Sequence, residues 1–156
     1  MFEPLGIISY LGGVSRFVTV VRVIGNGDIR TAQDVLAMWR HTNCAGIMIA
    51  RGSFGNPWIF GQARDLLEGR PMRPLPSAEE RFAVALEHAR LALRIQGDTR
   101  KTALEFRKHF GWYTKGLPGS AELRQRLFTI ESMHEAEAMF ARYLADQAVV
   151  EEVAAA

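Results

Sequence analysis

Apolar residues in the first half of the chain occur in short runs that end at glycine. The run Phe17-Val-Thr-Val-Val-Arg-Val-Ile24 is rich in β-branched residues and stops at Gly25-Asn-Gly27, which predicts a strand buried on both faces. Gly46-Ile-Met-Ile-Ala50 is a second such run and ends at Arg51-Gly52. Between them, Thr31-Ala-Gln-Asp34 opens a helix with a capping-box-like pattern, and apolar spacing continues this helix to His41. The order of these elements predicts a parallel β-α-β-α unit.

The second half of the chain has a different texture, with no strand-like run after Gly69. Arg70-Pro-Met-Arg-Pro-Leu-Pro76 holds three prolines, excludes regular structure and is the best domain boundary in the chain. Beyond it, Ser77-Ala-Glu-Glu80 opens a helix as a capping box. Further helices are predicted over Thr99–Lys115, Ser120–Phe128 and Met133–Ala148. The second half is therefore predicted to be a small helical bundle.

Charge is distributed unevenly, although the chain has an ordinary globular composition and a formal net charge of only +2. Between Asp98 and Arg126 the sequence has seven Lys and Arg but only three Asp and Glu. From Leu127 onward it has six Asp and Glu but only one Arg. This asymmetry is expected of a polyanion-binding face beside a solvated end, or equally of two ordinary charged helix faces.

One cysteine, Cys44, excludes an internal disulfide bond and fits a reducing compartment. No apolar run is long enough to span a bilayer, and the beginning of the chain has no signal-peptide pattern. We therefore expect a cytoplasmic protein. We expect no metal site.

Both predicted strands end in a glycine turn, Gly25-Asn-Gly-Asp28 and Ala50-Arg-Gly-Ser53. Such turns bring backbone N–H groups close to a phosphate, and the loops after the last two strands of (β/α) barrels commonly bind one. Pro57 would begin a helix whose N-terminus adds partial positive charge, and Arg51 would pair with phosphate oxygens. The tandem arrangement favours phosphate binding over two plain β-α connections.

Several motifs in these regions resemble one family. Val23-Ile-Gly-Asn-Gly-Asp-Ile29, Gly46-Ile-Met-Ile-Ala-Arg-Gly52 and Gly55-Asn-Pro-Trp-Ile-Phe60 are similar to the last two β-α units of the tRNA-dihydrouridine synthases. Phe106-Arg-Lys-His-Phe-Gly-Trp-Tyr113 and Gly116-Leu-Pro-Gly-Ser-Ala-Glu-Leu-Arg124 resemble the helical domain of the bacterial B-type branch. The resemblance extends from about Val20 to Tyr143.

The resemblance implies an FMN-containing (β/α)8 TIM barrel, of which residues 1–70 would be the C-terminal part, with 1–15 unmatched. Residues 77–150 would be a helical domain that binds tRNA. The family reduces uridine in tRNA to 5,6-dihydrouridine, with hydride passing from NADPH to FMN and then to the base. By this match Asn26, Gly27, Asp28, Ala50 and Arg51 would contact FMN, with Ala50 standing where the family often has glycine.

A full barrel needs about 250 residues and eight strands, so the resemblance also implies that earlier units are absent. The family's catalytic cysteine, and its flavin-contacting lysine and histidine, belong to those units, and we predict no catalytic residue in this chain. Cys44 is expected to be a small buried residue rather than a substitute acid. The chain is therefore expected to be truncated and inactive alone, with an N-terminal third of low stability or one completed by a separate chain that supplies barrel strands.

The helix predicted over Thr99–Lys115 has two faces. Its apolar face holds Ala103, Phe106, Phe110 and Tyr113, and its opposite face is basic. The candidate RNA-binding residues are Arg100, Lys101, Arg107, Lys108, His109 and Lys115. Trp112 borders the apolar face and is expected to pack there. Two alternatives remain: a non-catalytic RNA-binding remnant, and an unrelated phosphate-binding β-α fragment whose bundle is purely structural.

Overall fold

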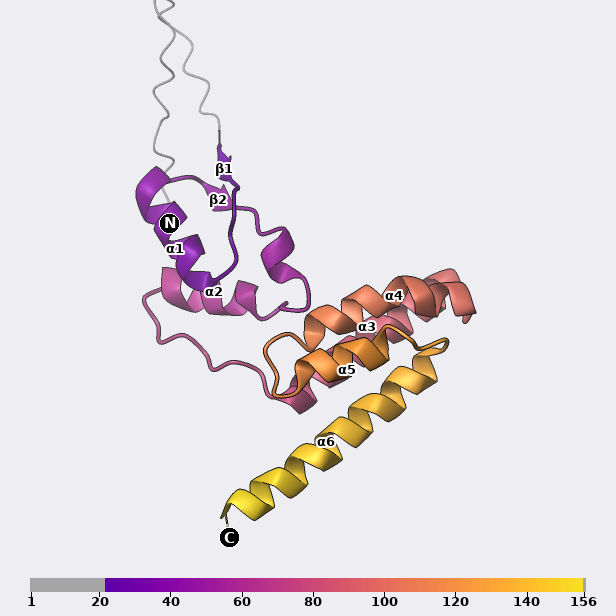
Figure 1. Ribbon diagram of the computed structural model, residues 1–156. Helices are drawn as coiled ribbons and strands as arrows, with labels where there is room; N and C mark the ends of the chain where they lie inside the picture. The colour runs from indigo at the N-terminus through magenta and orange to yellow at the C-terminus, as the bar shows by residue number, and fades with distance from the viewer. Residues whose placement is uncertain (1–21, 156) are drawn as a thin grey trace, which may run out of the picture. The chain divides into compact units, whose positions relative to one another are not determined.

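The computed structural model describes residues 22–155, which form two compact units (Figure 1). The mixed unit contains residues 22–53 and Ile59–Arg73, and the helical unit contains Phe54–Trp58 and residues 74–155. Most of the predicted first strand, residues 17–21, lies outside the described part of the chain. No helix among the described residues is long and apolar enough to cross a membrane.

The mixed unit is built on a short parallel pair of strands, β1 (Ile24–Gly25) and β2 (Gly46–Ile47), joined through helix α1 (Ala32–Thr42). Ile24 pairs with Gly46 and Gly25 with Ile47. The parallel order is as predicted. β2 is shorter than the predicted Gly46–Ala50 because its described partner has only two residues in strand conformation, although the Met48 N–H still donates to the Gly25 carbonyl over 2.8 Å.

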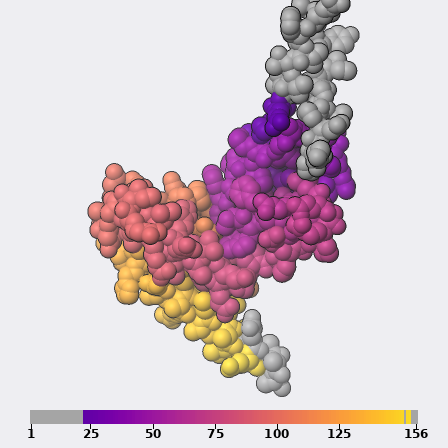
Figure 2. All heavy atoms as spheres, turned by 180° about the vertical axis from the view of Figure 1, so that it is seen from behind, coloured from indigo at the N-terminus to yellow at the C-terminus, as the bar shows by residue number. Residues whose placement is uncertain are grey.

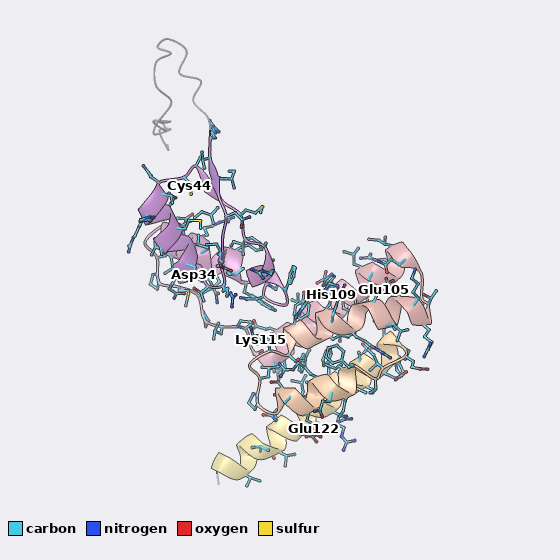
Figure 3. The ribbon with its side chains drawn as sticks, turned by 45° about the horizontal axis from the view of Figure 1, so that its top comes forward. Asp34, Cys44, Glu105, His109, Lys115 and Glu122 are labelled. Atoms are coloured by element: carbon cyan, nitrogen blue, oxygen red, sulfur yellow. The ribbon has the colours of Figure 1, made fainter. Side chains whose placement is uncertain are left out.

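Helix α1 begins where its capping residues predict. The Thr31 side chain accepts a hydrogen bond from the Asp34 N–H, and the Asp34 carboxylate accepts from the Thr31 N–H at 2.8 Å. These backbone N–H donors, that of Arg30 foremost, lower the pKa of Asp34. Asn43 then ends the helix in a left-handed conformation with φ of 50°. Figure 3 labels Asp34 and Cys44 near the two ends of this helix.

Helix α2 (Ile59–Leu67) packs its buried face against α1, so that Ala63 joins a core of Ile29, Ala32 and Val35. It begins two residues after Pro57, the predicted first helical position, because a turn intervenes. A short 3-10 helix, η1 (Arg51–Ser53), follows β2. Cys44 is buried, as predicted, and its Sγ would lie 3.0 Å from a Cβ placed on Gly25. Its size is therefore matched to close packing on β1.

The proline-rich segment after α2 has no regular structure, as predicted, but a buried carboxylate holds its first residues. Asp65 on α2 accepts hydrogen bonds from the Arg73 Nε at 2.7 Å and from the Arg70 guanidinium at 3.0 Å. Both arginines lower the pKa of Asp65 well below its ordinary value, Arg73 most. The Arg73 guanidinium fills the space that a side chain at Gly61 would need. Glycine at position 61 thus lets the segment fold back along α2.

The helical unit consists of α3 (Ala78–Gln96), α4 (Arg100–Tyr113), α5 (Ser120–Leu127) and α6 (Met133–Ala155). The predicted capping box of Ser77 and Glu80 is present at the start of α3. All four helices were predicted, and α6 extends seven residues beyond the predicted Ala148. Figures 1 and 2 show its C-terminal turns, in yellow, projecting from the bundle.

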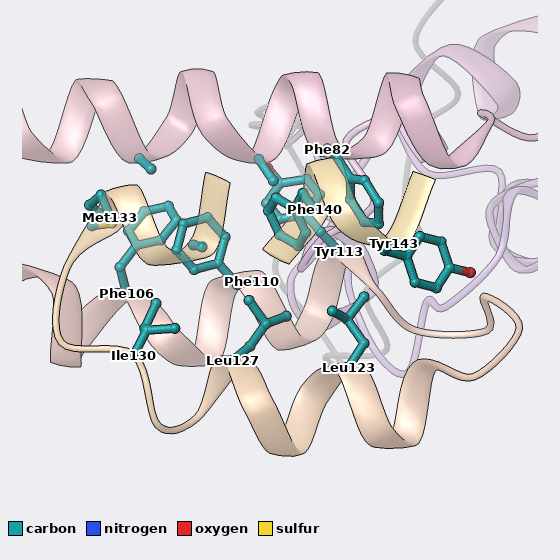
Figure 4. Close-up of a cluster of buried hydrophobic side chains, with 13 residues drawn as sticks. Phe82, Phe106, Phe110, Tyr113, Leu123, Leu127, Ile130, Met133, Phe140 and Tyr143 are labelled. Carbon is teal, nitrogen blue, oxygen red and sulfur yellow. The ribbon is translucent and has the colours of Figure 1, made fainter. Parts of the chain in front are cut away.

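All four helices contribute to one apolar core (Figure 4). Phe82 of α3 and Phe140 of α6 stack at its centre with ring centroids 4.2 Å apart, and Phe110 of α4 meets Phe140 edge to face. At one border the Tyr143 hydroxyl donates to the Pro118 carbonyl over 2.8 Å. The core therefore fixes α4, the helix that carries the candidate RNA-binding residues.

Candidate functional site

The loops after the two parallel strands leave the sheet at the same edge, and their side chains meet there. The guanidinium of Arg51, from the second loop, lies 3.2 Å from the carboxylate of Asp28 in the first. Arg30 approaches the same carboxylate at 3.8 Å. All three side chains are more than 70% exposed. The structure thus brings together two of the five predicted cofactor residues and adds Arg30, which the motif comparison did not single out.

The glycines of the two loops have different reasons for being glycine. Gly27 has φ of 143° and nothing within 4 Å of the position a Cβ would take, so its backbone is open to an approaching group. Gly52, by contrast, packs against the first loop, where a Cβ would lie 3.0 Å from the Arg30 Cα and closer still to the Ile29 carbonyl oxygen. The second glycine therefore serves the contact between the loops. Asn26 in the first loop and Ala50 in the second are exposed.

This loop pair fits a phosphate group in three respects. Two arginines face one carboxylate, which leaves a local excess of one positive charge. Arg51 is free to rotate from Asp28 toward a doubly charged oxyanion, because its present ion pair is exposed and therefore weak. Gly27 leaves open backbone next to Asp28, whose own φ of 44° is unusual for a residue with a side chain.

Helix α4 carries the other group of predicted residues, and its apolar face is buried as expected: Ala103, Phe106, Phe110 and Tyr113 are each 6% exposed or less. Its basic residues differ in their surroundings. Arg100 is paired with Glu131 at 2.6 Å, and Lys101 lies 3.8 Å from Glu105. Among the side chains that the structure describes, Lys108 and Lys115 form no ion pair, and both are exposed. Figure 3 labels Glu105 and His109 on this helix and Lys115 just after its end.

Arg107 departs from the expected outward-facing stripe. It is half-buried, and its guanidinium donates to the Ile130 carbonyl from both Nε, at 2.8 Å, and a terminal nitrogen. This carbonyl belongs to Ile130, a buried residue in the connection between α5 and α6, where a backbone acceptor without a helical partner needs a donor. The expectation of an outward-facing Arg107 was wrong because its partner, Ile130, lies 23 residues away in sequence, and helical periodicity carries no information about so distant a residue.

His109 is half-buried among aromatic rings rather than extended into solvent. Its ring centroid is 4.8 Å from Phe106, 5.1 Å from His88 and 4.9 Å from Trp112. Burial lowers the pKa of His109, and the charges of His88 and Lys108 lower it further. Burial also lowers the pKa of His88 and raises that of Tyr113, whose hydroxyl is 3.4 Å from His88 Nδ1. These shifts favour neutral imidazoles near pH 7.

Comparison with known proteins adds the family. The family model described as "Dihydrouridine synthase (Dus)" matches residues 10–153. This chain belongs to the dihydrouridine synthase family. The resemblance seen in the loop and helix motifs is therefore confirmed.

Curated relatives agree with this membership of the dihydrouridine synthase family. The chain is 35% identical over 125 residues to a "Probable tRNA-dihydrouridine synthase" of Mycobacterium leprae, covering 80% of this chain and 32% of the relative. It is 33% identical over 129 residues to the Synechocystis protein "Probable tRNA-dihydrouridine synthase 1", covering 83% and 34%. The "tRNA-dihydrouridine synthase B" of Pasteurella multocida is 34% identical over 115 residues, covering 74% and 34%. The chain spans about a third of the length of these relatives.

One feature of this member of the dihydrouridine synthase family has no signal in the sequence. The segment Phe54–Trp58 belongs to the helical unit, although it directly follows β2 and η1. Phe54 of this segment stacks on Trp112, with centroids 4.5 Å apart and planes at 22°. The motif Gly55-Asn-Pro-Trp-Ile-Phe60 indicates the family but not this contact. No local pattern indicates its partner, because Phe54 and Trp112 are far apart in sequence.

Proposed function

We propose that this chain is the FMN-phosphate-binding and tRNA-binding portion of a B-type tRNA-dihydrouridine synthase, an oxidoreductase that reduces uridine in tRNA to 5,6-dihydrouridine with FMN and NADPH. The observation that carries the proposal is the family match over residues 10–153. The parallel β-α-β-α order supports reading residues up to 70 as the last two β-α units of a TIM barrel. Residues 77–150 would be the tRNA-binding domain, and the setting would be the cytoplasm.

In this proposal the two loops hold the phosphate of FMN. Arg51 exchanges Asp28 for phosphate oxygens, and the backbone near Asn26, Gly27 and Ala50 supplies neutral donors. Asp28 then accepts from Arg30, which lies within 3.8 Å, so that the carboxylate keeps a cationic partner. Bound FMN would supply hydride transfer to the base.

The tRNA would bind along the basic residues of the helical unit. Lys108 and Lys115 are exposed and offer the direct phosphate contacts, whereas Arg100 and Lys101 would exchange their carboxylate partners for phosphate. Arg107 contributes first by fixing the end of α5, and His109 by its ring. Affinity is therefore expected to depend strongly on salt.

Turnover needs groups beyond those the described residues supply. Cys44 is 8% exposed, so its thiol is poorly placed to protonate a base. The remaining barrel strands would come from other parts of the polypeptide or from a separate chain. Ile24 and Met48, which are 59% and 48% exposed next to the sheet, offer such strands apolar surface to cover. The second candidate is a non-catalytic RNA-binding module that keeps the basic helical bundle, whose apolar core involves all four of its helices.

The test is the visible absorption of the purified chain after incubation with FMN and desalting, followed by a low-salt gel shift with tRNA. Retained flavin bands that disappear in Arg51→Ala, but persist in the exposed control Arg64→Ala on α2, would support the loop site. A colourless chain that shifts tRNA would support the RNA-binding module instead. A colourless chain that leaves tRNA unshifted would refute both roles for this portion.

A further inference from the structure

An aromatic pair on the helical unit, Phe54 and Trp112, is only partly covered by other side chains. Phe54 is 50% exposed, and one face of its ring lies on Trp112 of α4. Stacked rings in a protein core are normally sealed by further side chains, as Phe82 and Phe140 are here. The other part of the Phe54 ring is thus available to a flat ligand.

The local backbone holds Phe54 in this position. Gly55 has φ of +65°, and a Cβ there would lie 2.6 Å from both the Trp112 carbonyl oxygen and the Tyr113 nitrogen. The segment therefore lies directly against the end of α4, at a distance that only glycine allows. Trp58, at the other end of the segment, meets Tyr113 edge to face with centroids 6.4 Å apart. The contacts of Gly55 and Trp58 with the end of α4, together with the stacking of Phe54 on Trp112, preorganise the Phe54 ring and reduce the entropy lost on binding.

Two lysines are related to Trp112 by helical spacing. Lys108, Trp112 and Lys115 follow one another at intervals of four and three residues, which places them along one face of α4 and the turn after it. Both lysines are exposed, and neither has an ion-pair partner among the described side chains, which do not include that of residue 151. His109 adds its ring edge to Trp112 at 4.9 Å.

We propose that Phe54, stacked on Trp112 between Lys108 and Lys115, is a platform on which one unpaired nucleobase of an RNA strand stacks. The inference rests on the RNA-binding part of the proposed function and names the kind of contact made there. A flat ring between two cations matches a base between two backbone phosphates, the arrangement that single-stranded nucleic acid presents. An apolar protein surface would leave both ammonium groups unmatched.

The test uses the full chain and two RNA probes. One is a short oligouridylate carrying a single 2-aminopurine, whose fluorescence falls when the base stacks, and the other is a fully paired RNA duplex of the same length. The variants are Phe54→Ala, Phe54→Leu and Phe54→Tyr, with far-ultraviolet circular dichroism to confirm that each is folded. The side chain is half exposed, so truncation leaves the helical core intact.

We expect Phe54→Ala to weaken binding of the single strand about 5- to 150-fold and to abolish the 2-aminopurine quenching. Phe54→Tyr should retain both, and duplex binding should not change in any of the three. Lys108→Ala and Lys115→Ala should each reduce the slope of log affinity against log salt by about 0.7, which Phe54→Ala should leave unaltered.

Two results would overturn the platform but not the RNA-binding function. One is a Phe54→Ala variant that binds the single strand as tightly as the wild-type chain, and the other is a Phe54→Leu variant that keeps full affinity. The first result would show that the Phe54 ring does not contact the RNA. The second would show that any apolar side chain at this position serves as well as an aromatic ring. A wild-type chain that binds neither probe at low salt would overturn the proposed RNA-binding function together with the platform.

Discussion

Gly111 offers a direct test of the helical core, because it is a glycine that the structure does not require. It is buried in α4 with an ordinary helical φ, and a Cβ there would meet the Phe128 ring at 3.6 and 3.8 Å and the Arg124 Cδ at 3.9 Å. These are normal van der Waals distances. We therefore predict that Gly111→Ala stabilises the protein.

The magnitude follows from two contributions. Alanine is favoured over glycine inside a helix by about 1 kcal/mol, chiefly because it restricts the unfolded chain. The new methyl group adds at most about 0.8 kcal/mol of apolar burial against Phe128. Together they predict a gain of about 1 to 2 kcal/mol in the free energy of unfolding. For a unit of this size each kcal/mol corresponds to a rise of about 4 to 8 °C in the Tm of its transition.

Urea unfolding and differential scanning calorimetry of the full chain measure this change. The matched control is Gly55→Ala, which adds the same methyl group where φ is +65° and the Trp112 carbonyl oxygen would lie 2.6 Å away. That change should lower the free energy of unfolding by about 1 to 3 kcal/mol. A Gly111→Ala variant less stable than wild type would show that Phe128 does not leave the space described, and would refute the packing between α4 and the end of α5.

Three further predictions concern the core, the histidine pair and the linker. Phe140→Ala should lower the free energy of unfolding by about 3 to 5 kcal/mol, measured by urea unfolding, because Phe140 is 1% exposed; a loss below about 1 kcal/mol would contradict its central position. The pKa values of His88 and His109 in the folded state lie below the ordinary 6.5, so the unfolded state binds protons first as the pH falls. The free energy of unfolding should therefore fall as the pH drops below 6.5. Tm measured from pH 7.5 to 5.0 should show this decline, and His88→Gln should make it less steep. The charge of Lys108 also opposes protonation of His109. If the pH dependence of Tm is unchanged in His88→Gln, His88 does not contribute to it. Asp65→Asn should speed amide hydrogen exchange at Arg70, Met72 and Arg73, whereas Glu68→Gln, at an exposed partner of Arg70, should have little effect. Equal exchange rates in the two variants would refute the holding of this segment by the Asp65 carboxylate.

Much of the local structure followed from the amino-acid pattern because its causes are local. The capping boxes at Thr31 and Ser77 join residues three positions apart, and the structure begins helices at both places. The apolar face of α4 follows from helical periodicity, and Phe106 and Phe110 are buried on it. The family resemblance likewise rested on short motifs in order, and the family match confirmed it.

The candidate loop site was only half determined in this way. The residue types in the two turns predicted phosphate chemistry, but their spacing did not reveal that Asp28 already occupies Arg51. The sequence pattern also suggested phosphate binding as the reason for the glycines of both turns. Gly52 is instead required because it packs against the backbone of Ile29 and Arg30. The contact of two loops depends on how the strands pair, which no single run of residues specifies.

The sequence by itself determined the order of the helices, the capping boxes at Thr31 and Ser77, the buried face of α4 and the family, because these depend on neighbours along the chain and on motifs within short windows. Tertiary structure alone decided that Arg107 serves the Ile130 carbonyl, that Asp65 holds Arg73 and that Phe54 lies on Trp112. Side chains of arginine and phenylalanine have the same local pattern whether they face solvent, a carbonyl or another ring. Their role is set by which distant segment the folded core brings within a few ångströms.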